Sequence, residues 1–117
     1  EFAFRKLSGN DYGYKLKFKK GEVYYIKPVT KEQAQKFGEY MENLGYFNDE
    51  SEVSIQLNYD DTKKVYESRF VVDKEKLTED IRTSFKLIGI FASEKAFDGK
   101  KVDVHLCDER LNTLEVL

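Results

Sequence analysis

Val23-Tyr24-Tyr25 and Val65-Tyr66-Glu67 open two stretches of the chain that follow the same pattern. Each stretch, 23–57 and 65–106, begins with an alternating strand, continues with an amphipathic helix and ends with a second alternating strand. Because both helices connect strands in the same way, both can cover one face of a single sheet. The repeat predicts a small α+β domain, a two-layer sandwich with an internal pseudo-repeat.

Period-2 alternation of apolar and polar side chains marks the strands. It predicts strands over 14–19, 23–27, 53–59, 66–72, 102–107 and 113–117. A capping box, Thr30-Lys31-Glu32-Gln33, predicts the start of the first helix, and Gly45 stands where a left-handed C-terminal cap belongs. Asp73 is the predicted N-cap of the second helix. The resulting order is ββαββαββ.

This order contains a ferredoxin-like βαββαβ core with one strand added at each end. We therefore expect two helices packed on one face of a mostly antiparallel sheet, with right-handed crossovers. The strand order stays open, because the first core strand of that topology already has neighbours on both sides. Residues 14–117 are predicted to form one domain, and residues 1–13 a loose lead-in or the end of a linker.

The second helix is predicted to face the sheet with a broad apolar stripe. The stripe comprises Leu77, Ile81, Ser84, Phe85, Ile88 and Ala92, broadened by Leu87, Ile90 and Phe91. Gly38 and Gly89 lie inside the two predicted helices, where a glycine costs about 1 kcal/mol relative to alanine. We interpret both glycines as marks of close packing against a neighbouring element.

Composition argues against polyanion and membrane partners. The 117 residues include 20 Lys plus Arg and 22 Asp plus Glu, so no strong field favours nucleic acid or anionic lipid. The longest apolar run, Leu87 to Ala92, is far shorter than the roughly 20 residues that span a bilayer. The open face of the predicted sheet carries no aromatic side chain for stacking RNA bases. We expect no nucleic-acid binding and no direct membrane insertion.

His105, Cys107 and Asp108 form the one cluster of potential metal or catalytic side chains that the sequence suggests. His105 and Cys107 project from the same face of a strand, but a zinc site needs at least three protein ligands and the chain has one His and one Cys. Nothing near Cys107 in the sequence lowers its thiol pKa, as a nucleophile would require. We therefore predict no catalytic residues, no metal and no cofactor.

The open face of the sheet is predicted to be polar and exposed to solvent. Its candidate interaction surface comprises Gln56, Asn58, Arg69, Asp103, His105 and Cys107. The leading hypothesis is a non-enzymatic accessory domain that binds a protein partner or itself through this face or the sheet edges. One alternative is a small-ligand sensor, with a pocket between helices and sheet that Phe37, Met41, Tyr66 and Phe85 would line. A less favoured alternative is an enzyme or metal site that uses His105 and Cys107.

Several segments from Gly21 onward look like an uncharacterised bacterial domain that is attached to multidomain or membrane-anchored proteins. The matching segments are residues 21–25, 28–40, 45–47, 69–72 and 105–108, and the resemblance covers about five-sixths of the chain. It rests on hydrophobic and turn positions and transfers no functional residue. It implies an accessory domain of a larger bacterial protein, either extracytoplasmic or cytoplasmic. The start at Glu1, with no Met, suggests an excised piece of a longer protein or a processed product.

Overall fold

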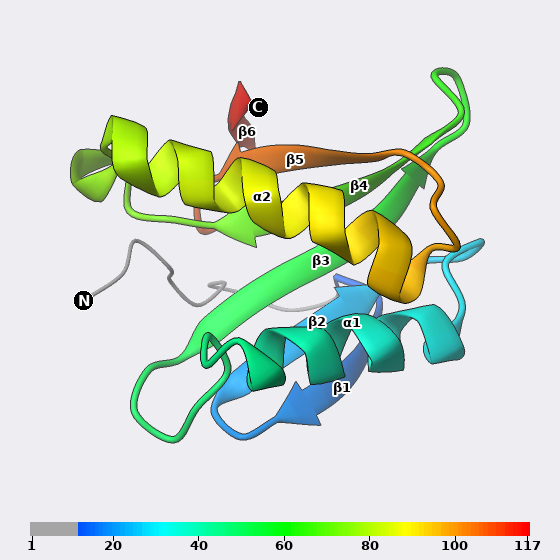
Figure 1. The fold of residues 1–117 in the computed structure, drawn as a ribbon, viewed down its shortest axis with the longest axis horizontal. Helices are drawn as coiled ribbons and strands as arrows, with labels where there is room; N and C mark the ends of the chain where they lie inside the picture. Colours follow the sequence, from blue (N-terminus) through cyan, green and yellow to red (C-terminus); the bar gives the residue numbers. More distant parts are fainter. Residues whose placement is uncertain (1–11) are drawn as a thin grey trace.

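The computed structural model describes residues 12–117, which form a six-stranded mixed sheet with two helices on one face (Figure 1). The elements are β1 (Tyr14–Phe18), β2 (Gly21–Tyr25), α1 (Lys31–Asn43), β3 (Val53–Asp60), β4 (Val65–Val71), the 3-10 turn η1 (Lys74–Lys76), α2 (Glu79–Ala96), β5 (Val102–Cys107) and β6 (Thr113–Val116). The α+β class and the ββαββαββ order are confirmed. Residues 1–11 of the predicted lead-in lie outside the described residues.

The strands lie in the sheet in the order of the sequence, β1-β2-β3-β4-β5-β6. β2 pairs with β3, and β4 with β5, in parallel, while the other three pairs are antiparallel. A ferredoxin-like sheet is a split arrangement, in which another strand separates the two parallel strands of a unit. The ferredoxin-like prediction is therefore wrong in its strand order, because each β-α-β unit here keeps its parallel strands as neighbours.

The two crossover connections are of opposite hand. β3 and β4 run antiparallel, both units advance in the same direction across the sheet, and both helices cover the same face. Two crossovers so arranged cannot both be right-handed. In Figure 1 the connection through α2 is right-handed and the connection through α1 is left-handed, a hand found in only about 2% of such units. The expectation of right-handed crossovers thus holds for one unit alone.

The helix termini follow the capping rules, with one correction. The Thr30 hydroxyl accepts from the Gln33 amide and the Gln33 side chain accepts from the Thr30 amide, which confirms the capping box. Gly45 has a φ of +87°, as the left-handed cap requires. Asp73 caps η1 instead of α2, and the N-cap of α2 is Thr78, whose hydroxyl accepts from the Ile81 amide. The sequence analysis did not consider Thr78, and Asp73 starts only the single turn of η1.

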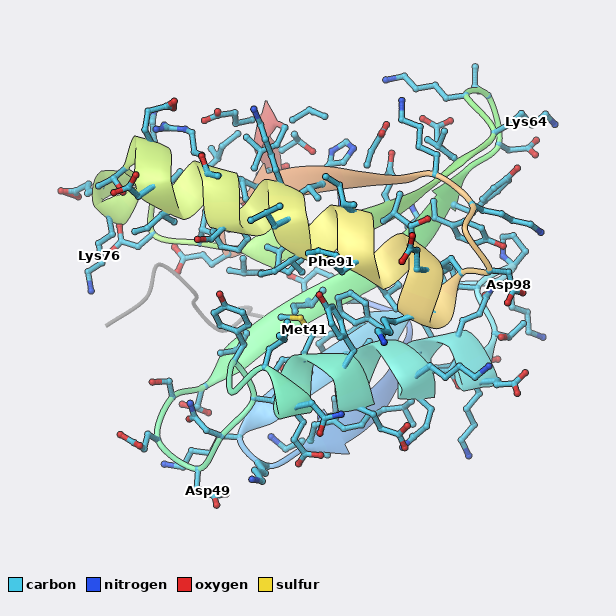
Figure 2. The ribbon with its side chains drawn as sticks, in the orientation of Figure 1. Met41, Asp49, Lys64, Lys76, Phe91 and Asp98 are labelled. Atoms are coloured by element: carbon cyan, nitrogen blue, oxygen red, sulfur yellow. The ribbon has the colours of Figure 1, made fainter. Side chains whose placement is uncertain are left out.

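The outer side of α2 carries apolar side chains that face solvent. Leu87 is 47% exposed, Ile90 60% and Phe91 47%, and Figure 2 shows Phe91 on the side of α2 next to α1. The prediction that these three residues broaden the sheet-facing stripe is wrong. The sheet can contact only one side of a helix, so these residues, which lie about 120–160° around the axis from Phe85, stay outside.

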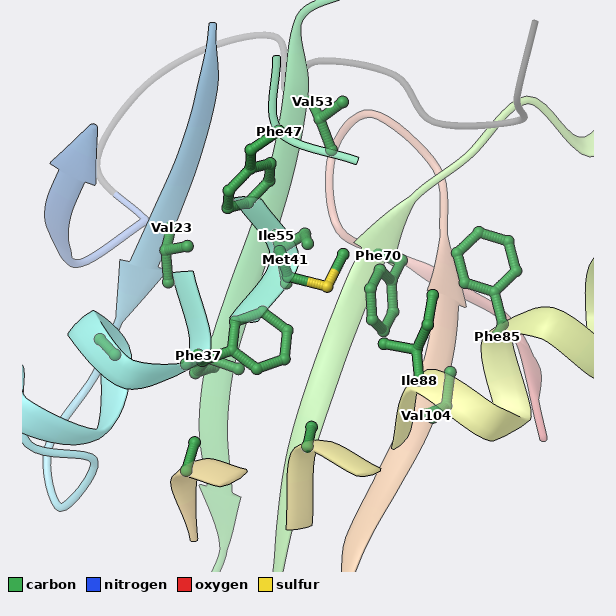
Figure 3. Close-up of a cluster of buried hydrophobic side chains, with 14 of the residues drawn as sticks. Val23, Phe37, Met41, Phe47, Val53, Ile55, Phe70, Phe85, Ile88 and Val104 are labelled. Atoms are coloured by element: carbon green, nitrogen blue, oxygen red, sulfur yellow. The ribbon is translucent and has the colours of Figure 1, made fainter. Parts of the chain in front are cut away.

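The core fills the space between the helices and the sheet. Phe70 of β4 lies between Phe37 of α1 and Phe85 of α2 (Figure 3), with ring-centroid distances of 6.4 and 5.1 Å. All three side chains are fully buried. Met41 of α1 is also fully buried in this cluster. The two halves of the pseudo-repeat therefore share one core, which Phe70 joins.

Both helix glycines mark close packing, as predicted. A Cβ on Gly38 would lie 2.2 Å from the Phe18 ring, and a Cβ on Gly89 would lie 2.4 Å from Cγ2 of Val104. Real Cβ atoms do not approach other atoms so closely. The two positions set how near α1 lies to β1 and how near α2 lies to β5.

Gly89→Ala is expected to destabilise the protein although alanine is the better helix former. The gain in helix propensity is about 1 kcal/mol, but overpacking a core costs about 1–3 kcal/mol, and the β-branched Val104 has little freedom to move aside. We expect a net loss of about 1 kcal/mol in urea unfolding. Thr83→Ala, at an exposed position of α2, is the control and should be neutral or slightly stabilising. Equal stabilisation by both variants would contradict the close contact.

Candidate functional site

The sheet face opposite the helices brings together all six residues of the predicted interaction surface. In the register of β3, β4 and β5, Gln56 lies opposite Arg69, which lies opposite His105. Asn58 lies opposite Glu67, which lies opposite Asp103. Cys107 follows His105 two residues later on β5 and shares its face. The face assignment made from the period-2 pattern is therefore correct.

The expectation that this face is exposed is wrong at its centre. Gln56 is 6% exposed, His105 8% and Cys107 is fully buried, whereas Asn58, Arg69 and Asp103 are partly exposed. The Gln56 side-chain amide donates to the carbonyl oxygen of Tyr12 at 2.9 Å. A polar pattern on a strand does not by itself imply contact with water, because polar side chains that satisfy one another can be buried.

One buried polar cluster joins β1, β2 and β3. Glu22 is only 3% exposed, and the Ser54 hydroxyl donates to its carboxylate at 2.6 Å. The ammonium group of Lys15 lies 3.9 Å from the same carboxylate. These contacts give the buried Glu22 carboxylate its polar partners. The sequence analysis did not single out Glu22 or Lys15.

A second and larger cluster centres on Arg69 and joins β4, β5 and β6. Its Nη1 donates to Glu67 at 3.2 Å, and its Nη2 donates to the carbonyl oxygen of Leu111 at 2.7 Å and to the Thr113 hydroxyl at 2.9 Å. His105 Nε2 lies 3.4 Å from the other oxygen of Glu67. Arg69 thus ties the turn before β6 to the middle of the sheet. Thr113 was missed as a partner, since no short-range pattern links it to residue 69.

The contacts of His105 select one tautomer. Its Nδ1 lies 3.4 Å from Arg69 Nη1 and 3.2 Å from the Thr113 hydroxyl. A guanidinium group has donors only, so Nδ1 must accept and the ring proton is on Nε2, directed at Glu67. Burial lowers the pKa of His105, Glu67 opposes that shift and Arg69 adds to it. The imidazole is therefore neutral in the folded protein at neutral pH.

Acidification is expected to destabilise the protein through His105. Because its pKa is lower in the folded than in the unfolded chain, the unfolded chain binds the proton first, and stability falls as the pH drops below about 6.5. His105→Gln cannot titrate, so its free energy of unfolding should fall less between about pH 7.5 and about pH 5.5. His105 is the one histidine of the chain. Parallel curves for the two proteins in urea titrations at each pH would contradict this assignment.

The surroundings of Cys107 and Asp108 indicate that both residues stabilise the fold. Burial raises the pKa of the Cys107 thiol, which keeps the sulfur protonated and a poor nucleophile. The Asp108 carboxylate accepts from the Arg110 and Asn112 amides, both at 2.9 Å, and the Asn112 bond is the main cause of its lowered pKa. Asp108 therefore shapes the turn between β5 and β6.

The polar face is satisfied within itself. Among residues 12–117, no buried side-chain nitrogen or oxygen lacks a hydrogen-bond partner, and no group of three or more His, Cys, Asp and Glu side chains has a metal-binding arrangement. None of the described helices is long and apolar enough to cross a membrane. The arrangement can hold strands together and respond to protonation of His105.

A family model described as an N-terminal domain, from an uncharacterised family, matches residues 15–117. No curated protein and no solved structure matches the chain. The match covers the sheet from the second residue of β1 to the end of β6.

Proposed function

The chain belongs to the AF_1994_N family of N-terminal domains, and we propose that it is a non-enzymatic interaction domain of a larger protein. The description of the family as an N-terminal domain supports the proposal that further domains accompany it. The resemblance noted in the sequence supports an accessory role in a bacterial protein.

One observation carries the proposal: large apolar side chains lie half exposed on the helix layer. They are Leu44 at 46%, Leu87 at 47%, Ile90 at 60% and Phe91 at 47% exposure. Contiguous apolar surface on a soluble domain commonly marks an interaction site. We therefore place the interaction surface on the helices, and not on the buried centre of the polar sheet face.

The chemistry of the polar face supports a structural role. The Cys107 thiol is buried and has a raised pKa. His105 is committed to Glu67, Arg69 and Thr113. A catalytic pair needs a reactive thiol that a substrate can reach, so these contacts favour the non-enzymatic proposal.

A small-ligand sensor is the second candidate, at a different place from the one predicted. Phe37, Met41 and Phe85 are fully buried core residues, and they do not line an open site. An open groove of about 580 Å³ lies instead before α1, within the volume range of ligand sites. It is lined by Tyr14, Tyr25, Lys27, Pro28, Val29, Thr30 and Lys31.

Site-specific photo-crosslinking tests the interaction proposal. A photoreactive amino acid replaces Phe91 in the full-length protein in its host cells, and Lys63, in the exposed turn between β3 and β4, is the control position. We expect a discrete protein cross-link from position 91 only. Excess wild-type domain should compete for that product, and the Ile90→Asp domain should not. No protein product from position 91, or the same product from position 63, would overturn the proposal.

A further inference from the structure

We propose that the partner of the helix layer is a second copy of this chain, and that two α2 helices pair antiparallel about a two-fold axis near Ile90. This inference rests on the proposed interaction function and specifies its partner. A two-fold interface must be self-complementary, since each patch meets its own copy. The α2 surface meets that requirement in shape and in charge.

The shape of the surface offers both projecting side chains and a recess. Ile90 is the most exposed of the large apolar side chains on α2, at 60%. An open groove of about 220 Å³ lies near it, between α1 and α2, with Phe91 in its lining. The groove is lined by Tyr40, Leu44, Tyr46, Ser84, Leu87, Ile88 and Phe91. A projecting apolar side chain of one copy can occupy the groove of the other.

The charges next to Ile90 fit an antiparallel copy. Lys86 precedes Ile90 by four residues and Glu94 follows it by four, so all three share one side of α2, one turn of about 5.4 Å apart. Both charged residues are exposed. In an antiparallel pair centred on Ile90, Lys86 of each copy faces Glu94 of the other, and two opposite-charge contacts form.

The ends of α2 give the same orientation. Its first turn carries the exposed Glu79 and Asp80, and the exposed Lys100 and Lys101 follow its last residue, Ala96. An antiparallel copy centred on Ile90 brings the acidic first turn of one helix towards the segment of the other copy that follows Ala96 and carries these two lysines. The opposed helix dipoles also favour the antiparallel arrangement.

The ion-pair network leaves Lys86 and Glu94 available. Within residues 12–117, α2 forms one ion pair, between Arg82 and Glu115 of β6 at 3.0 Å. Neither Lys86 nor Glu94 has a hydrogen bond or ion pair with a described residue. A second copy can therefore pair with both without breaking a contact within residues 12–117.

Charge reversal tests the inference by sedimentation velocity over a range of concentrations. We expect the wild-type chain to form dimers, and Lys86→Glu and Glu94→Lys each to raise the dimer dissociation constant on the order of tenfold. The double variant Lys86→Glu/Glu94→Lys should dimerise like wild type. A mixture of the two single variants should form heterodimers more readily than either variant alone, since both contacts are then complementary.

Two further variants locate the interface. Ile90→Asp is expected to abolish dimers, while Leu114→Asp, at an exposed apolar position on β6, should leave them intact. Circular dichroism confirms that each variant folds. A dimer lost on Leu114→Asp but kept on Ile90→Asp, or no recovery in the mixture, would overturn the inference. A wild-type monomer at about 1 mM, a concentration at which even weak pairs form, would also overturn it. A cross-link from position 91 to a different protein would still support the interaction function.

Discussion

Arg69→Met is expected to lower the free energy of unfolding by about 3–5 kcal/mol, the usual loss when one partner of a buried ion pair is removed. Glu67 would lose the guanidinium partner of its carboxylate, with its side chain only 11% exposed. The Leu111 carbonyl and the Thr113 hydroxyl would each lose a donor. Urea unfolding monitored by circular dichroism measures the loss.

The double variant Glu67→Leu/Arg69→Met is the control for this prediction. Replacing both ions by apolar groups removes the stranded charge, so the double variant should be more stable than Arg69→Met alone. Lys64→Met, at an exposed position beside Asp61, should change stability by less than about 0.5 kcal/mol. If Arg69→Met costs no more than Lys64→Met, the cluster does not hold the sheet together.

Phe70→Ala is expected to cost about 3–5 kcal/mol, the range for truncating a buried phenylalanine. Phe70 is fully buried and contacts Phe37 of α1 and Phe85 of α2. The cavity would lie where the two halves of the pseudo-repeat share their core. We expect weaker packing of both helices, seen as faster amide hydrogen exchange in α1 and α2 together.

Phe91→Ala is the matched control, because it removes the same ring from a half-exposed position of α2. Its effect on the monomer should be about 1–1.5 kcal/mol, since only about half of the lost surface was buried. Comparable losses for the two variants at low protein concentration would mean that the helix layer is packed differently from the arrangement in Figure 3.

The elements could be predicted from sequence because local patterns determine them. The Thr30 capping box and the Gly45 cap depend on residues within one turn. The alternation in Val53–Asp60 sets which side chains face the helices. Strand order is not local, because it depends on pairing between segments that the sequence pattern does not link. The ferredoxin-like order and the observed sequential order satisfy the same alternation of apolar and polar side chains.

The polar face could be predicted only in part. Alternation placed Arg69, His105 and Cys107 together, but not their burial, which depends on partners far along the chain. Arg69 is 44 residues from Thr113 and 42 from Leu111. The sequence analysis made the converse error at Ile90, which is exposed. An apolar residue on a helix is ordinarily assigned to the core.

The sequential strand order makes the chain divisible. Residues 14–62 contain β1, β2, α1 and β3, and residues 63–117 contain β4, α2, β5 and β6, so a single cut separates two contiguous halves. The cut would fall in the exposed turn between β3 and β4, where chain breaks are best tolerated. In a ferredoxin-like sheet, a strand of one half lies between the two parallel strands of the other half, so neither fragment alone could form its strand pairs. Here each fragment keeps its own neighbouring strands, and the two could be expressed separately and reassemble as a complementation pair.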